Sequence, residues 1–311
     1  MYFFKDRFKN IHNPDATIGL DIGNSMIKWV SLGCNQELKQ YAIQTISSPM
    51  AIAHKDIAQI ATILKKTLHQ RESIRNCVVN IPDILICSKL MQIDRADSQR
   101  IEEIIELLVE QSIPYPLHKI YFDYQVFDPS SEKPTILIVA CHKEHLDFRL
   151  KIIQQANLIP IAVDVSSHAL ERAYSFFYSD RVNENTILLD IGATQLSLLF
   201  LNNFYTIVYC ENLFHSEEQE SILLQIKRSV KRYVLAHPYC ILKQIFLIGA
   251  NKLLLNYLVN RLDGFLELKI QILKQGDRIK FNSQLNRSKL EENFLNIFLS
   301  YGLALKINSS L

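Results

Sequence analysis

The chain has 311 residues, of which 48% are hydrophobic and 21% are charged, and its formal net charge is +2. This length allows two lobes with separate hydrophobic cores, and the composition excludes an intrinsically disordered protein. The near-neutral charge balance also excludes nucleic acid as a partner held by bulk charge. No apolar run reaches the length of a membrane span, and the segment Met1–Lys9 lacks the apolar core of a signal peptide, so we expect a cytoplasmic protein.

The first part of the chain, residues 1–81, predicts one lobe that opens with strands. Residues 17–32 have the pattern of a strand, a tight turn and a second strand. Further strands are expected at 38–46 and 76–81. Between them, apolar residues recur at helical spacing over 57–68.

The next part, residues 82–157, predicts a small α+β subdomain inserted between elements of the first lobe. Strands are expected at 84–93, 119–127 and 135–141, and a helix at 143–156. Asp97 or Ser98 is placed to cap a further helix, which the Ile113–Pro116 segment ends.

The remaining chain predicts a return to the first lobe and then a second lobe. Residues 158–184 form the return and the link between the lobes, with a strand at 159–165 and a helix at 166–178. Residues 185–290 form the second lobe, and 291–311 form a C-terminal helix that packs back on the first lobe. Within the second lobe we expect strands at 205–210, 244–248 and 266–273 and helices at 216–235 and 252–262.

A short motif occurs twice, once near the start of each predicted lobe. Thr17–Gly23 and Thr186–Gly192 each contain an apolar run followed by Asp-Ile-Gly, and a second apolar run follows each turn. Glycine at such a turn permits positive φ and close approach of a ligand. Turn amides beside small hydroxyl residues can hold phosphate oxygens, and an aspartate at a strand end can hold the water ligands of Mg²⁺. The two hairpins therefore predict two phosphate-binding loops.

These loops define the candidate binding site for ATP with Mg²⁺. A third turn, at Gly249, follows an apolar strand and opens a helix, so its backbone is placed to pass beside an adenine ring. The metal would be held through water by Asp21 and Asp190. The predicted site residues are Asp21, Gly23, Asn24, Ser25, Lys28, Asp190, Gly192, Ala193, Thr194 and Gly249.

Two other clusters of charged or metal-binding residue types have simpler interpretations. His142 and His145 share a helix face, but no second group of ligands accompanies them, so we do not expect a metal there. Lys227–Arg228 with Lys231–Arg232 is interpreted as a solvated helix face, with binding of an anion or a lipid as the alternative.

Several further segments spread over nearly the whole chain form a recognisable combination. They are Gly19–Lys28, Ile113–Leu117, Phe122–Val126, Ala156–Pro160, Val163–Val165, Ala169–Ala173, Arg228–Ser229 and Gly302–Leu305.

This combination resembles the PilM family, actin-like proteins of type IV pilus assembly that are related to FtsA. The resemblance implies the α/β actin-like ATPase fold, with two lobes, a nucleotide cleft between them and a small inserted subdomain. It also implies a groove between that subdomain and the first lobe, which binds the N-terminal cytoplasmic peptide of the membrane protein PilN. Through this partner the protein would lie beneath the inner membrane and join other proteins of the pilus assembly platform.

Two departures from the family pattern predict weak nucleotide binding and at most a weak ATPase. The adenine turn has Gly249–Ala250 instead of two glycines, and Cys210–Ser216 contains no glycine where the family has a glycine-rich turn. The sequence also identifies no residue to position an attacking water. A scaffold is the leading interpretation. An active ATPase or a sugar-kinase-like phosphotransferase is the alternative, and the sequence leaves self-association open.

Overall fold

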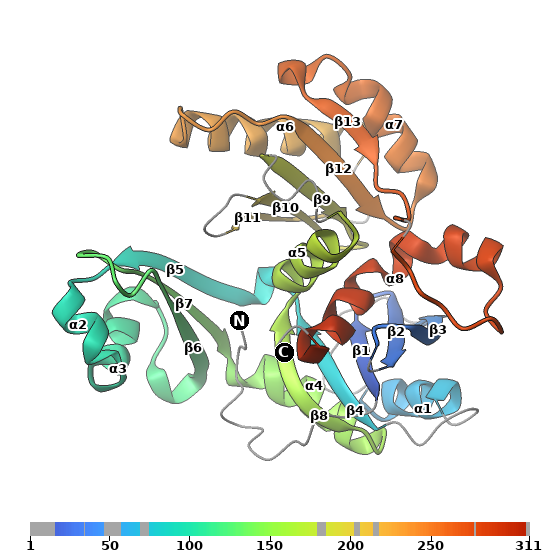
Figure 1. Ribbon diagram of the computed structural model, residues 1–311, viewed down its shortest axis with the longest axis horizontal. Coiled ribbons are helices and arrows are strands. Elements are labelled where there is room, and N and C mark those ends of the chain that lie inside the picture. Colours follow the sequence, from blue (N-terminus) through green and yellow to red (C-terminus); the bar gives the residue numbers. More distant parts are fainter. Residues whose placement is uncertain are drawn as a thin grey trace.

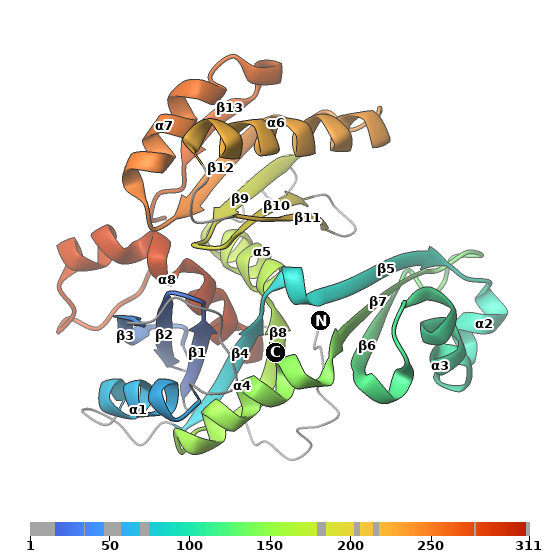
Figure 2. The ribbon, with the colours of Figure 1, turned by 180° about the vertical axis from the view of Figure 1, so that it is seen from behind.

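The computed structural model describes residues 16–33, 35–46, 57–68, 75–178, 185–201, 206–213, 218–276 and 278–308. These residues form two five-stranded sheets, one three-stranded sheet and the helices that cover them. Figures 1 and 2 show the two large sheets facing each other across a pair of helices, with the small sheet to one side.

The first large sheet has the strand order β3-β2-β1-β4-β8. The β1–β2 and β2–β3 pairs are antiparallel, whereas β4 runs parallel to both β1 and β8. The predicted strand–turn–strand at 17–32 is confirmed as β1 and β2. The strands are β1 (Ala16–Ile22), β2 (Met26–Gly33), β3 (Leu38–Thr45), β4 (Asn76–Ile81) and β8 (Ile159–Val165).

The second large sheet repeats this arrangement, with the order β11-β10-β9-β12-β13. Its β9–β10 hairpin occupies the position that β1–β2 occupies in the first sheet, so the duplicated motif marks a duplicated substructure. The strands are β9 (Thr186–Ile191), β10 (Gln195–Leu201), β11 (Ile207–Asn212), β12 (Gln244–Gly249) and β13 (Lys269–Ile272).

Five layers result from the alternation of side chains along these strands. On the first sheet, residues such as Ile18 and Leu20 pack under α1 (Ile57–Leu68) and α4 (Lys143–Gln155). On the second, Leu189 and its neighbours pack under α6 (Gln219–Ala236) and α7 (Lys252–Leu262). The opposite faces of both sheets share a middle layer of two helices, α5 (Ser166–Phe177) and α8 (Arg287–Asn308) (Figure 1).

Aromatic rings fill this middle layer where the two helices meet. The ring of Phe177 on α5 lies 4.9 Å from that of Tyr301 and 5.3 Å from that of Phe294, both on α8, measured between centroids. Tyr174, one turn earlier on α5, contacts Phe246 of the second sheet at 5.6 Å. These rings belong to one cluster with Val30 of the first sheet, so the middle layer joins the cores of both lobes.

A buried ion network fixes α8 against the first lobe. Asp164 of β8 forms an ion pair with the Lys306 ammonium on α8 at 2.8 Å and accepts a hydrogen bond from the Arg172 guanidinium on α5 at 2.8 Å. Arg172 also donates to the carbonyl oxygen of Gly302 at 2.7 Å. Burial alone would raise the pKa of Asp164, but the charges of Lys306 and Arg172, together with His168, lower it to about 2.

The three-stranded sheet, order β5-β7-β6, is antiparallel throughout. One face of β7 packs on α3, whereas Val139 and Cys141 of the other face join the core of the first lobe. The predicted helix is confirmed as α3, but the prediction of Asp97 or Ser98 as its cap is wrong. Arg100, with φ −118° and ψ 25°, is the N-cap of α3 and separates it from α2. The elements are β5 (Ile86–Gln92), β6 (Ile120–Phe127), β7 (Thr135–His142), α2 (Arg95–Gln99) and α3 (Ile101–Ser112).

Short 3-10 turns connect several of these elements. The turn η3 (Asp83–Leu85) joins β4 to β5, η4 (Leu117–Lys119) precedes β6, and η6 (Phe265–Glu267) precedes β13. None of the helices within the described ranges is both long and apolar enough to cross a membrane.

The contact of α8 with its neighbours is close enough to require glycine. A Cβ atom on Gly302 would overlap the carbonyl oxygen of Ala169 on α5, and a Cβ atom on Gly19 would overlap backbone atoms of α8. Because backbone atoms block both positions, a methyl group at either glycine would require α8 to move away from α5 or from β1.

We therefore expect Gly302→Ala to destabilise the fold by at least about 2 kcal/mol, measured as the free energy of unfolding in urea. Gly33→Ala is the matched control, since its Cβ would meet the flexible end of the Lys39 side chain instead of backbone. Equal stability of the two variants would contradict the close contact.

Candidate functional site

All ten residues predicted for the nucleotide site line one cavity of about 470 Å³ between the two large sheets. The turn after β1 and the turn after β9 approach it from opposite lobes, and the start of α7 closes one end. The structure thus brings together Asp21, Gly23, Asn24, Ser25, Lys28, Asp190, Gly192, Ala193, Thr194 and Gly249. Their role in binding a nucleotide stays a prediction.

The two turns share one backbone geometry. Gly23 donates its N–H to the carbonyl of Met26 at 3.0 Å, and Gly192 donates to that of Gln195 at 2.9 Å. The expectation of positive φ at these turns is wrong, since Gly264 is the single glycine with positive φ in the described part of the chain. Glycine instead avoids crowding, because a Cβ at Gly23 would lie 3.1 Å from the Met26 oxygen.

One hydrogen bond joins the two turns across the cavity. The side-chain amide of Asn24 donates to the hydroxyl of Thr194 at 2.6 Å, although the two residues lie in different lobes. Both groups are of the type that holds phosphate oxygens, and a phosphate placed between the turns would have to replace this bond. The structure therefore shows the cleft with its two turns in direct contact.

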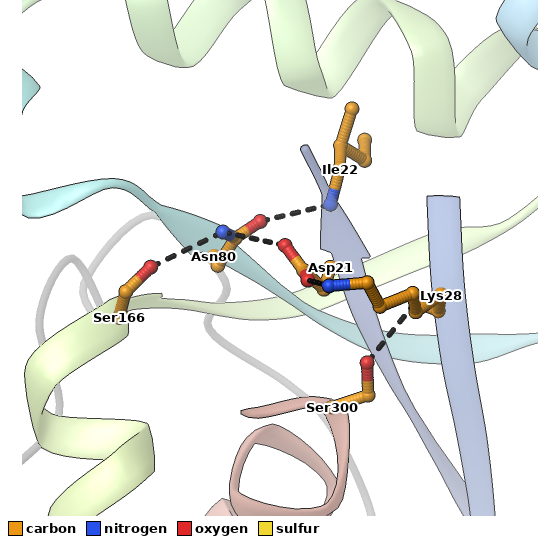
Figure 3. Close-up of polar contacts among 6 residues, drawn as sticks. All are labelled: Asp21, Ile22, Lys28, Asn80, Ser166 and Ser300. Carbon is orange, nitrogen blue, oxygen red and sulfur yellow. Dashed lines mark hydrogen bonds and ion pairs between the residues drawn. The ribbon is translucent and has the colours of Figure 1, made fainter. Parts of the chain in front are cut away.

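A network around Asp21 organises the first-lobe wall of the cavity (Figure 3). The carboxylate accepts from the side-chain amide of Asn80 at 3.0 Å and from the Lys28 ammonium at 3.3 Å. The Asn80 amide also donates to the Ser166 hydroxyl at 3.2 Å, and its oxygen accepts from the backbone N–H of Ile22 at 3.0 Å. These contacts fix Asp21, which is 4% exposed, facing the cavity.

Two residues of this network escaped the sequence analysis. Asn80 is the penultimate residue of β4, and Ser166 is the first residue of α5. The one signal for Asn80 is its polarity within an apolar strand. A third contact comes from α8, where the hydroxyl of Ser300 donates to the backbone carbonyl of Lys28 at 3.2 Å (Figure 3). The C-terminal helix thus helps to position Lys28.

Asp190 faces Asp21 from the second lobe. Burial raises the pKa of Asp190 to about 6, the positive charge of Lys28 opposes this rise, and the negative charge of Asp21 adds to it. A cation between the two carboxylates would relieve both the burial and the repulsion. The described residues contain no group of three or more His, Cys, Asp or Glu able to hold a metal. The chemistry of the two aspartates fits a Mg²⁺ ion held through water, and this role stays a prediction.

The predicted adenine turn lies at the other end of the cavity. Close packing by itself explains the glycine at this turn, because a Cβ on Gly249 would lie 3.0 Å from the carbonyl oxygen of Ile191. Asn251 caps α7 by accepting from the N–H of Leu254 at 3.1 Å. Apolar side chains cover this end and would suit the face of a base. They are Leu254 and Leu255 of α7 and Leu295 and Leu299 of α8.

Solved structures similar to this chain define its class. A chain of the PilM–PilN type IV pilus biogenesis complex matches with a TM-score of 0.82 and 18% identity, covering 96% of this chain and 99% of that one. A Bacteroides thetaiotaomicron protein described as having an actin-like ATPase fold matches at 0.52 and 10%, covering 91% and 96%. The ethanolamine utilization protein EutJ from Carboxydothermus hydrogenoformans matches at 0.54 and 11%, covering 96% and 93%. This protein has the actin-like ATPase fold.

The particular family follows from the sequence match. A family model described as type IV pilus assembly protein PilM matches residues 19–219. The match spans more than half of the chain and includes both hairpins, so this chain belongs to the PilM family. The resemblance inferred from the sequence is thereby confirmed.

The raised pKa of Asp190 gives a prediction for the ligand-free protein. The folded state holds this proton up to about pH 6, whereas the unfolded chain releases it near pH 4. The ionised carboxylate therefore costs stability as the pH rises from about 4 to 6, and the full cost, about 3 kcal/mol, persists above pH 6. We expect Asp190→Asn to stabilise the fold by this amount at pH 7.5 and by little at pH 4.

The measurement is urea unfolding at both pH values without nucleotide or Mg²⁺. Asp263→Asn, at an exposed position after α7, is the matched control and should change stability little at either pH. A destabilised Asp190→Asn protein at pH 7.5 would show that the carboxylate is a net stabilising group instead.

Proposed function

We propose that the protein is a scaffold of the type IV pilus assembly platform that binds Mg-ATP between its lobes and the N-terminal cytoplasmic peptide of a PilN-like membrane protein. The observation that carries this proposal is that the two hairpins, whose turns share one hydrogen-bond pattern, meet at one cavity in a chain of the PilM family. Through its partner the protein would lie at the cytoplasmic side of the inner membrane with other platform proteins.

The cavity supports nucleotide binding through complementary chemistry at its two ends. At one end, backbone amides of both turns, the hydroxyls of Ser25 and Thr194 and the Lys28 ammonium would hold phosphate oxygens. At the other end, leucines of α7 and α8 and the backbone at Gly249 would cover the base. Mg²⁺ bound through water to Asp21 and Asp190 would neutralise phosphate charge.

We propose that turnover is far below the 1 to about 10³ s⁻¹ of typical enzymes. Asp21 already accepts from Asn80 and Lys28, and Asp190 is assigned to the metal, so neither carboxylate is placed as a base for an attacking water. The bound nucleotide would then act through lobe closure and not through its hydrolysis.

A second cavity supports the binding of a peptide. It measures about 550 Å³ and lies between the small sheet, the start of α5 and β11. The sequence analysis expected the groove between the inserted subdomain and the first lobe, whereas β11 belongs to the second lobe. Both β5 and β11 are edge strands of their sheets, and both line it. An extended peptide can pair with such an edge and place its side chains in pockets. The similar PilM chain was solved in complex with PilN.

Asp83, a half-buried carboxylate in η3, lines this groove beside the start of α5. Asp83 accepts from the backbone N–H of Ser167 at 3.0 Å and from the Ser167 hydroxyl. Burial raises the pKa of Asp83 to about 7. The two hydrogen bonds from Ser167 lower this pKa, and the negative charge of Asp190 raises it further. A basic or amino group of a peptide would meet a complementary partner here.

We propose the domain division of the sequence analysis with one changed boundary. The inserted subdomain would begin at 82 and end near His142, not at 157, because Leu146, Ile152 and Ile153 of α4 pack in the core of the first lobe. Residues 158–184, 185–290 and 291–311 keep their assignments as link, second lobe and C-terminal helix.

The nucleotide proposal predicts that Mg-ATP stabilises the protein. A ligand at a hundred times its dissociation constant adds about 2.7 kcal/mol, which a thermal melt detects. Thr194→Val should reduce the shift, since it removes a hydroxyl from the cavity while keeping the shape of the side chain. Thr62→Val, on the exposed face of α1, is the matched control.

Two outcomes would contradict the nucleotide proposal. One is an unchanged melting temperature at millimolar Mg-ATP together with no heat of binding in calorimetry. The protein would then be a scaffold that binds no nucleotide. Rapid hydrolysis that disappears in Asp190→Ala would favour the active ATPase.

The partner proposal predicts that a labelled N-terminal peptide of the cognate PilN-like protein binds in the groove. Leu90 lines the groove and is 39% exposed, so Leu90→Glu should weaken binding at least about tenfold by placing a charge against the peptide. Leu107→Glu is the matched control, because Leu107 is 55% exposed on α3 and does not line the groove. Fluorescence anisotropy measures both, and equal loss in the two variants would place the peptide elsewhere.

A further inference from the structure

The second lobe contains a long segment with positive charge and no negative charge. Between Glu220 and Asp263, which covers α6, β12 and α7, the sequence has no Asp or Glu. Since the whole chain is nearly balanced at +2, this is a local asymmetry. The basic residues within it are Lys227, Arg228, Lys231, Arg232, Lys243, Lys252 and Arg261.

Within this segment, the end of α6 and the loop after it expose large apolar side chains. Tyr239 is 97% exposed, Leu235 is 82% exposed and Ile241 is 74% exposed. Lys231, one turn before Leu235, and Lys243, just before β12, are exposed beside them. We call these five residues the α6 tip.

The α6 tip is held by its own neighbours. Tyr233 is buried, stacks on Phe200 at 3.8 Å between ring centroids and on His237 at 4.3 Å, and donates its hydroxyl to the Cys240 sulfur at 3.5 Å. The side-chain amide of Asn185 donates to the carbonyl of Ile241 at 2.8 Å. His237 and Cys240 are thus held against the buried Tyr233, whereas Tyr239 and Ile241 are exposed.

The position of the tip separates it from the nucleotide cavity. Figures 1 and 2 show α6 in the outermost layer of the second lobe, on the far side of the sheet from α5 and α8. None of the five tip residues lines the cavity or the groove, but His237, in the same loop, lines the groove. If the groove holds the peptide of a membrane protein, as proposed above, the tip lies beside that partner's path to the membrane.

We propose that the α6 tip inserts into the interface of an anionic lipid bilayer. Tyrosine, leucine and isoleucine side chains that protrude from a surface gain free energy by entering the boundary between headgroups and acyl chains. Lysines beside them keep their ammonium groups at the phosphates while their stems follow the apolar surface. The segment that carries the tip has basic residues and no acidic residue, so its positive charge complements a negatively charged membrane surface.

The test is flotation of the purified full-length protein with lipid vesicles and with no partner present, so that its result does not depend on the groove. We expect binding to vesicles rich in phosphatidylglycerol, at least about tenfold weaker binding to pure phosphatidylcholine, and release by high salt. Binding of equal strength to both kinds of vesicle would overturn the proposal. So would no binding to either, which is the result expected if the tip binds a protein partner instead.

Variants separate the contribution of the apolar side chains from that of the lysines. Tyr239→Ser with Ile241→Ser should weaken binding at least about tenfold, whereas Leu253→Ser, 80% exposed at the start of α7, should not. Lys231→Gln with Lys243→Gln should weaken it about thirtyfold, whereas Lys280→Gln with Lys289→Gln, at exposed positions outside the segment, should not. Circular dichroism checks that each variant is folded, and equal losses in tip and control variants would overturn the assignment to the tip.

Discussion

The backbone contact of α8 with β1 and α5 is the constraint on which the rest of the structure depends. Glycines at Gly19 and Gly302 let the helix approach until no Cβ fits between the backbones. Asp164 then binds Lys306 of α8 and Arg172 of α5 in one buried ion network. Breaking either ion pair would leave a buried charge, so the C-terminal helix is locked into the first lobe.

This fixed middle layer also shapes the cleft. Because α5 and α8 contact both large sheets, the two duplicated hairpins face each other at a defined separation, close enough for Asn24 to reach Thr194. Both helices contribute to the site directly, through the hydroxyl of Ser166 on α5 and that of Ser300 on α8. Closure of the lobes and the geometry around Asp21 therefore depend on the same packing.

The cavity proposed to bind nucleotide and the groove proposed to bind a peptide share a wall. Asn80 and Pro82 line the cavity, and Asp83, the next residue along the chain, lines the groove. At the start of α5, Ser166 faces the cavity and Ser167 faces the groove. Residues that line one cavity are thus covalently bonded to residues that line the other, whereas none of the five α6 tip residues lines either cavity.

The sequence by itself determined the strands, the duplicated turns, the turn at Gly249 and, through these turns, ten of the residues that line the cavity, because apolar periodicity and turn chemistry act over a few neighbouring residues. It did not reveal Asn80, Ser166 or Ser300, since their roles arise from contacts between segments far apart in the chain. It assigned α4 to the inserted subdomain, whereas its apolar face packs on the first sheet. Which apolar faces meet is decided by long-range packing, and only the tertiary structure shows it.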